Sequence, residues 1–211
     1  MKIEVAILTK SSKNGGYCVA GIDMNTGEWV RFVSNNEETH GALSNYDISY
    51  AGGRICKPLD VVSVHIVEAV PSAHQPENYL IDSDKYWIKT GECTLSDILK
   101  VHPAEVQPYL YGNLGPYVDS KGIDGIGYSL TLIKVSYLVL SQTTNINGKP
   151  KTKASFTYNG KQYSNMAVTD PHFYSVQDGT RFADAYLVVS LPDTPLPEDC
   201  YYKFVAQIYP Q

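Results

Sequence analysis

The chain has 211 residues, of which 43% are hydrophobic and 18% charged, so it can build the core of one large domain or of two small ones. Its 17 basic and 22 acidic residues give a net charge of −5, which argues against general binding to phosphate backbones and leaves only a local basic patch. The cysteines lack Cys-x-x-Cys spacing, which argues against a zinc ribbon or a redox pair and favours buried thiols: Cys18, Cys56, Cys93 and Cys200.

The N-terminal stretch "MKIEVAILTK" contains the acidic Glu4, and its apolar run is too short for a signal peptide. No segment approaches the length of a membrane-spanning helix. Free thiols are typical of a reducing compartment. We therefore expect a cytoplasmic protein with no membrane partner.

The first third of the chain reads as β-structure. Short apolar runs predict strands over residues 3–8, 17–23 and 28–34, and the last two are joined by the turn "MNTG". A polar section over 35–57 is expected to be a loop, and "LDVVSVHIVEA" resumes strand character over 59–69.

The centre is less regular. "TLSDILKVHP" predicts a short helix, with Thr94 as its N-cap, Asp97 three residues later and an end before Pro103. The segment 109–127 is dense in Gly and Tyr and is expected to be a loop.

The last third returns to strands, over residues 129–142, around the Asn159–Gly160 turn, and over 183–191 and 201–209. The pattern predicts an all-β fold with a short helix, organised as two small barrels or sandwiches. We place the first barrel at residues 1–90, a helix-and-loop connector at 91–127 and the second barrel at 128–211. No sequence repeat relates the halves.

Several stretches together resemble a bacterial family that carries a dual OB-fold domain. They run from near the start of the chain to near its end: "GGYCVAGID", "GEWVRFVS", "LDVV", "HQPENYLI", "FTYNGKQYSNMAVTDPHFY", "VVSLP" and "YYKFVAQIY". The resemblance implies two fused OB-like β-barrels. Because OB folds often bind oligonucleotides or sugars, it also implies a binding role, and it brings no settled substrate and no assigned catalytic residue.

The Asn159–Gly160 pair predicts a tight hairpin with a type I′ turn. In that register Tyr158 faces Lys161, Phe156 faces Tyr163 and Ala154 faces Asn165. The aromatic residues then share one face, which we expect to be the core, while most of the lysines lie on the other face. The basic patch is expected to form a phosphate-facing edge: Lys149, Lys151, Lys153 and Lys161.

The stretch "GEWVRFVS" offers a second candidate site. Strand alternation puts Val30 and Phe32 toward the core and Trp29 and Arg31 on the opposite face. An exposed indole beside a guanidinium would stack on a base or a sugar ring, with Tyr17 on the partner strand extending the pair. The alternative is structural, with Trp29 covering a hydrophobic gap and Arg31 paired to an acidic residue.

Two polar clusters are weaker candidates, and the sequence favours a structural role for both. They are His74, Glu77 and Asn78 in "HQPENYLI", and Asp170 and His172 in "TDPHF". Neither cluster supplies a metal-ligand set or a nucleophile with its base, and polar residues beside Pro are common in turns and caps. Neither a phosphate loop nor a dinucleotide motif is present, so no metal and no cofactor are expected.

These observations favour a non-enzymatic module that binds single-stranded nucleic acid or a nucleotide-like ligand. The first alternative is a protein-interaction or accessory module of a bacterial operon, in which a surface rich in the chain's 17 tyrosines contacts a protein partner. The second is an enzyme with a site around His74, Glu77 and Trp87 in the loop-rich centre.

Overall fold

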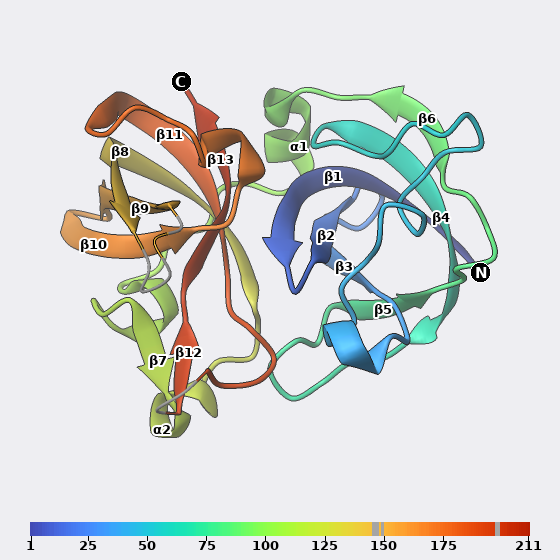
Figure 1. Cartoon of the computed structure of the whole chain (residues 1–211), viewed down its shortest axis with the longest axis horizontal. Helices are drawn as coiled ribbons and strands as arrows, with labels where there is room; N and C mark the ends of the chain where they lie inside the picture. Colours follow the sequence, from blue (N-terminus) through green and yellow to red (C-terminus); the bar gives the residue numbers. More distant parts are fainter. Residues whose placement is uncertain (145–147, 149, 197–198) are drawn as a thin grey trace. The chain divides into compact units, whose positions relative to one another are not determined.

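The computed structural model describes residues 1–144, 148, 150–196 and 199–211, and most of their regular structure is β-strand, as the sequence predicts (Figure 1). The chain divides into two compact units. Residues 1–72 and 76–103 form the first, and residues 73–75 and 104–211 form the second. The residues expected to be a connector, 91–127, are therefore shared between the units, with the change at residue 103.

The first unit is built on a closed ring of five strands. These are β1 (Lys2–Lys13), β2 (Gly16–Asp23), β3 (Trp29–Val33), β4 (Asp60–Ala69) and β5 (Asn78–Ile81). They pair in the order β1-β2-β3-β5-β4, and β4 pairs back onto β1. Only β3 and β5 run parallel within the ring. A further strand, β6 (Ile88–Glu92), lies beside β4.

The long strand β1 closes this ring because it pairs with two neighbours. Its first half pairs with β4, its second half pairs with β2, and a bulge interrupts the β2 register between Ile7 and Thr9. Next to this bulge, a Cβ on Gly21 would lie 2.1 Å from the carbonyl oxygen of Ala6. Glycine is therefore required where the two backbones approach each other.

The expected alternation along β3 is confirmed. Val30 and Phe32 point into the core at 3% and 1% exposure, and the Phe32 ring lies 4.9 Å from that of Trp87. Helix α1 (Leu95–Val101) ends the first unit where the sequence predicts a helix. Its N-terminus is capped by reciprocal hydrogen bonds between Thr94 and Asp97.

Two short 3₁₀ turns lie in loops that follow the third strand of each ring. They are η1 (Glu37–Thr39) and η3 (Pro171–Phe173). A third turn, η2 (Leu110–Gly112), the strand β7 (Tyr117–Asp119) and the short helix α2 (Ser120–Ile123) lie within the segment expected to be loop.

The second unit repeats the strand order of the first. Its ring consists of β8 (Leu130–Thr144), β9 (Pro150–Tyr158), β10 (Lys161–Val168), β11 (Thr180–Ser190) and β13 (Phe204–Pro210). The pairings run β8-β9-β10-β13-β11 and close onto β8, with β10 and β13 parallel. β12 (Cys200–Tyr202) lies in the connection between β11 and β13 and pairs with β7. The two rings therefore share one topology without a visible sequence repeat.

The hairpin of β9 and β10 confirms part of the predicted register and corrects the rest. Tyr158 faces Lys161 and Phe156 faces Tyr163, as predicted. Ala154, however, faces Met166 and not Asn165, because a bulge interrupts β10 between Tyr163 and Met166. Asn165 adopts a φ of 60°, a left-handed conformation that asparagine tolerates better than most residues.

Lys203, between β12 and β13, is a fully buried lysine. Its Nζ donates to the carbonyl oxygen of Leu110 at 2.7 Å and to the backbone and side-chain oxygens of Asn113, both at 2.9 Å. All three acceptors are uncharged. Burial therefore lowers the pKa of Lys203 to about 7.

Replacement of Lys203 by Met tests this pKa. Above pH 7 the Lys203 ammonium of the folded wild-type chain loses its proton. In the unfolded chain the same group stays protonated until the pH reaches the ordinary pKa of lysine. The free energy of unfolding of wild type relative to Lys203→Met should therefore rise from pH 7 to pH 10, by at most about 1.4 kcal/mol per pH unit. Urea unfolding at several pH values measures the difference, and a constant difference would contradict the lowered pKa.

Candidate functional site

Two lysines lie on the outer face of β9. Lys151 is exposed and Lys153 half-buried, whereas the alternating Thr152 and Ala154 point inward at 2% and 0% exposure. Within the described ranges, neither lysine forms an ion pair. Burial, and then the neighbouring charge of Lys151, lower the pKa of the Lys153 ammonium. This face therefore carries positive charge, and no carboxylate among the residues that the structure describes forms an ion pair with it.

An aromatic residue joins Lys153 on this face through two strand pairings. Lys153 pairs with Ala167 of β10, and Ala167 pairs with Phe204 of β13. Paired residues point to the same side of a sheet, and the adjacent Val168 and Val205 are core residues. Phe204 and Lys153 therefore share the outer face, separated by one small side chain.

A pair of tyrosines lies near the start of β13. Tyr202 of β12 pairs with Tyr117 of β7, and their ring centroids are 5.5 Å apart. Tyr117 is 40% exposed and Tyr202 half-buried. Tyr202 precedes Phe204 by two residues, and the buried Lys203 lies between them in the chain. Alternation along the chain therefore puts both aromatic side chains on the side opposite Lys203.

The aromatic residues of the hairpin are part of the core. Phe156, Tyr158 and Tyr163 are at most 3% exposed. The Tyr158 hydroxyl donates to the carbonyl oxygen of Glu105, and the Tyr163 hydroxyl accepts from the N–H of Leu110. These tyrosines therefore anchor the segment that precedes β8.

The other predicted lysines are placed differently from Lys151 and Lys153. Lys161 is half-buried at the hairpin end, with its Nζ 4.7 Å from the centre of the Tyr109 ring. Lys149 lies outside the described residues.

The matching row of the first barrel is buried. Ala20 of β2 pairs with Arg31 of β3, which pairs with Asn78 of β5, and their exposures are 0%, 3% and 7%. The Arg31 Nε donates to Glu77 Oε1 at 3.2 Å, which is the acidic partner that the structural alternative anticipated. The Glu77 carboxylate therefore holds the Arg31 guanidinium. A stacking pair with Trp29 would require this guanidinium to be exposed, and it is buried.

The other members of that candidate site are half-buried and lie apart. The Trp29 ring contacts His102 edge-to-face at 5.4 Å. Tyr17 lies at the opposite end of β2 from Ile22, the residue that pairs with Trp29, and Lys10 lies over its ring.

Asp170 has a structural environment. The fully buried carboxylate accepts hydrogen bonds from the N–H groups of His172 and Ile208 and from Gln207 Nε2, so it connects η3 to β13. Burial raises its pKa, although the hydrogen bonds and His172 act in the opposite direction.

The remaining polar candidates are distributed over both units. His74 belongs to the second unit and contacts the Tyr201 ring at 5.2 Å, whereas Glu77 and Asn78 belong to the first. Trp87 is a core residue at 2% exposure. In the ranges that the structure describes, no group of three or more His, Cys, Asp or Glu side chains is arranged to hold a metal ion. The helices of these ranges are all too short or too polar to cross a membrane.

Phe204 and Tyr202 were not singled out from the sequence. The signal was present in "YYKFVAQIY", where alternation puts Tyr202 and Phe204 on one side and Lys203 and Val205 on the other. Which side faces water depends on the pairing with β10, and that pairing joins residues distant in the chain.

The Arg31–Glu77 pair yields a stability prediction. Glu77→Gln leaves a buried guanidinium without its carboxylate, so the free energy of unfolding should fall by about 3 kcal/mol. Adding Arg31→Met removes that unpaired charge, and the double variant should lose less than the sum of the single changes. Denaturant unfolding of Glu77→Gln, Arg31→Met and the double variant measures the coupling between the two residues. Strictly additive losses of unfolding free energy would contradict it.

A family model described as a dual OB-containing domain matches residues 3–208. No curated protein matches the chain significantly, and no solved structure does. The match spans almost the whole chain and agrees with two rings of one strand order. A dual OB domain suggests a binding module. The chain therefore belongs to the dual OB-containing domain family.

Proposed function

We propose that the protein binds single-stranded nucleic acid across β9, β10 and β13 of the second barrel. The observation that supports this most directly is the row Lys153–Ala167–Phe204 on the outer face, with Lys151 beside it. In OB folds the second and third strands and the loop between the fourth and fifth form the usual face for oligonucleotides. Here these elements are β9, β10 and the connection that contains β12.

The chemistry of this face suits a single strand. Binding without strong sequence preference needs cations for the phosphates and aromatic rings on which bases stack. Lys151 and Lys153 supply the charge, and Phe204 supplies a ring within the same row. Only the small side chain of Ala167 separates Lys153 from Phe204 in this row.

A phosphate bound beside Lys153 would counteract the lowering of its pKa. Burial and the charge of Lys151 both disfavour the Lys153 ammonium. A phosphate placed between the two lysines offsets their mutual repulsion and favours the charged form. The pair Tyr117–Tyr202 then offers a second place for stacking, next along the chain from Phe204.

The double variant Lys151→Ala/Lys153→Ala tests the charge contribution. We expect it to bind a fluorescent oligothymidylate of about 12 nucleotides more weakly, since one OB fold covers roughly 4–16 nucleotides. The slope of log affinity against log salt should decrease by roughly 1.4, or about 0.7 for each lost phosphate contact on a single strand. Fluorescence anisotropy at several salt concentrations measures both quantities.

The matched control is Lys2→Ala/Lys121→Ala, which removes the same charge from two exposed lysines outside the face. It should leave the slope within error of wild type. An equal loss of oligonucleotide affinity in both double variants would mean that the net charge of the chain, and not this face, controls binding. Wild-type binding that is insensitive to salt would favour a protein partner instead.

Phe204→Leu tests stacking separately from charge. It retains an apolar side chain but removes the ring, so affinity for the same oligonucleotide should fall by about 1–3 kcal/mol with an unchanged salt slope. Phe182→Leu is the control, because Phe182 is a half-buried ring of the same barrel that packs against Phe173 and the core. Similar losses in the two leucine variants would contradict the assignment to Phe204.

A further inference from the structure

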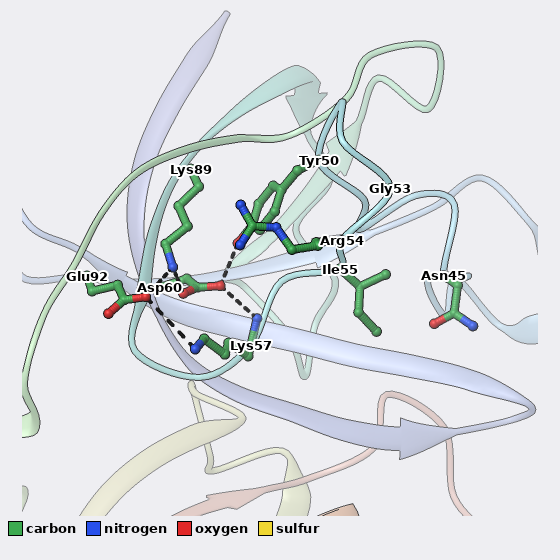
Figure 2. A pocket seen from close by; sticks show the side chains of 9 residues that line it. All are labelled: Asn45, Tyr50, Gly53, Arg54, Ile55, Lys57, Asp60, Lys89 and Glu92. Atoms are coloured by element: carbon green, nitrogen blue, oxygen red, sulfur yellow. Dashed lines mark hydrogen bonds and ion pairs between the residues drawn. The ribbon is translucent and has the colours of Figure 1, made fainter.

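An open pocket of about 640 Å³ lies in the first unit (Figure 2). It is lined by the loop between β3 and β4, the first residue of β4 and two residues of β6. The lining residues are Asn45, Tyr50, Gly53, Arg54, Ile55, Lys57, Asp60, Lys89 and Glu92. Charged and polar side chains predominate, so the pocket suits a charged ligand better than an apolar one.

Asp60 organises one side of the pocket. Its side chain is 1% exposed, and its Oδ2 accepts from the Tyr50 hydroxyl at 2.6 Å and from the N–H of Lys57 at 3.0 Å. Lys89 Nζ lies 2.6 Å from Asp60 Oδ1 and also pairs with Glu92. Burial opposes the charged form of Asp60, but the hydrogen bonds from Lys89, Tyr50 and Lys57 outweigh it and hold the Asp60 pKa below its usual value.

These contacts occupy Lys89, whereas the other two cations of the pocket are exposed. Lys57 Nζ is 3.9 Å from Glu92, at the limit of an ion pair, and the Lys57 side chain is 65% exposed. Arg54 is exposed, and the described part of the chain provides it with no ion-pair partner. Figure 2 shows its guanidinium beside the Tyr50 ring, with the Asp60 carboxylate drawn between it and the ammonium of Lys57.

The charges do not balance within the pocket. Three cations, Arg54, Lys57 and Lys89, face the two carboxylates of Asp60 and Glu92. In a chain with a net charge of −5, this local excess is contrary to the overall balance. An exposed guanidinium and an exposed ammonium in the lining of one pocket match the oxygens of a phosphate group, since Arg binds in a planar fork and Lys as a point charge.

We propose that this pocket binds a phosphate monoester, with Arg54 and Lys57 contacting the phosphate oxygens. Asp60 positions the Lys57 backbone and holds Lys89 in place, and the Tyr50 hydroxyl donates to Asp60. A free nucleotide and the 5′-phosphate end of an oligonucleotide present this same group. The pocket is distinct from the lysine and aromatic face of the second barrel, and this inference does not depend on the function proposed for that face.

Calorimetric titration of the full chain with AMP, adenosine and inorganic phosphate tests the proposal. We expect AMP to bind and adenosine to bind at least tenfold more weakly, because charge-assisted hydrogen bonds to the phosphate are lost. Arg54→Ala/Lys57→Ala should weaken AMP binding by about tenfold or more. Lys2→Ala/Lys85→Ala removes two exposed lysines of the same unit that do not line the pocket, and should leave AMP binding unchanged.

Oligonucleotides with a 5′-phosphate or a 5′-hydroxyl distinguish the two sources of the group. A preference for the 5′-phosphate that disappears in Arg54→Ala/Lys57→Ala assigns the pocket to strand ends, whereas binding of AMP alone assigns it to free nucleotides. In wild type, NMR titration with AMP should shift the amide signals of Gly53 and Lys57, which requires no variant. Wild type that binds none of the phosphate probes, or equal losses in both double variants, would overturn the proposal.

The variant Lys151→Ala/Lys153→Ala separates this pocket from the second-barrel face. It should retain AMP binding in full, just as Arg54→Ala/Lys57→Ala should retain the salt-dependent binding of oligothymidylate that lacks a terminal phosphate. Loss of AMP binding in Lys151→Ala/Lys153→Ala would overturn the assignment of AMP to the first unit.

Discussion

The sharing of one long strand between two neighbours is the constraint on which each barrel depends. β1 pairs with β2 and β4, and β8 pairs with β9 and β11, so neither ring leaves its first strand with an unpaired edge. Each strand bends where its register shifts, near Leu8 in β1 and at Tyr137, with a φ of 53°, in β8. Once a ring is closed, every strand has a defined inside and outside.

The two barrels use the outside of the same strands in opposite ways. In the first barrel the middle residue of the row Ala20–Arg31–Asn78 is Arg31, and its guanidinium is buried. A buried guanidinium needs an ion-pair partner, and Glu77 supplies the carboxylate. In the second barrel the middle position is Ala167, and the charge stands at one side on Lys153. A buried charge closes a surface against a ligand because its hydrogen bonds are already made. A small neutral residue leaves the flanking groups free to act.

Local patterns predicted the fold well. The Asn159–Gly160 turn, the alternation of Val30 and Phe32, and the Thr94 cap each depend on residues within a few positions of one another, and the structure confirms them. The resemblance to dual OB-fold proteins is likewise confirmed over residues 3–208.

The candidate sites were harder to predict because they depend on distant pairings. Glu77 lies 46 positions from Arg31, and Phe204 reaches Lys153 only through Ala167. The sequence could show that Arg31 had two possible environments but could not select one. It also could not show that the loop after β3 and the strand β6 together line an open pocket, since neither contains a recognisable motif.

The bulge at Asn165 has a consequence for how this surface could change. If β9 and β10 kept every residue but paired without this bulge, the hairpin would continue in its initial register and Lys153 would face Met166 in place of Ala167. Met166 would then project outward between the lysine and Phe204, and Ala167 would leave a void among the core side chains. The bulge therefore keeps Met166 inside and Ala167 outside. Deletion of Ser164 or Asn165 would preserve that arrangement with regular pairing, because these two residues lie opposite the single residue Ser155. In this protein an irregularity of strand pairing, as much as the composition of the strand, determines the chemistry of its outer face.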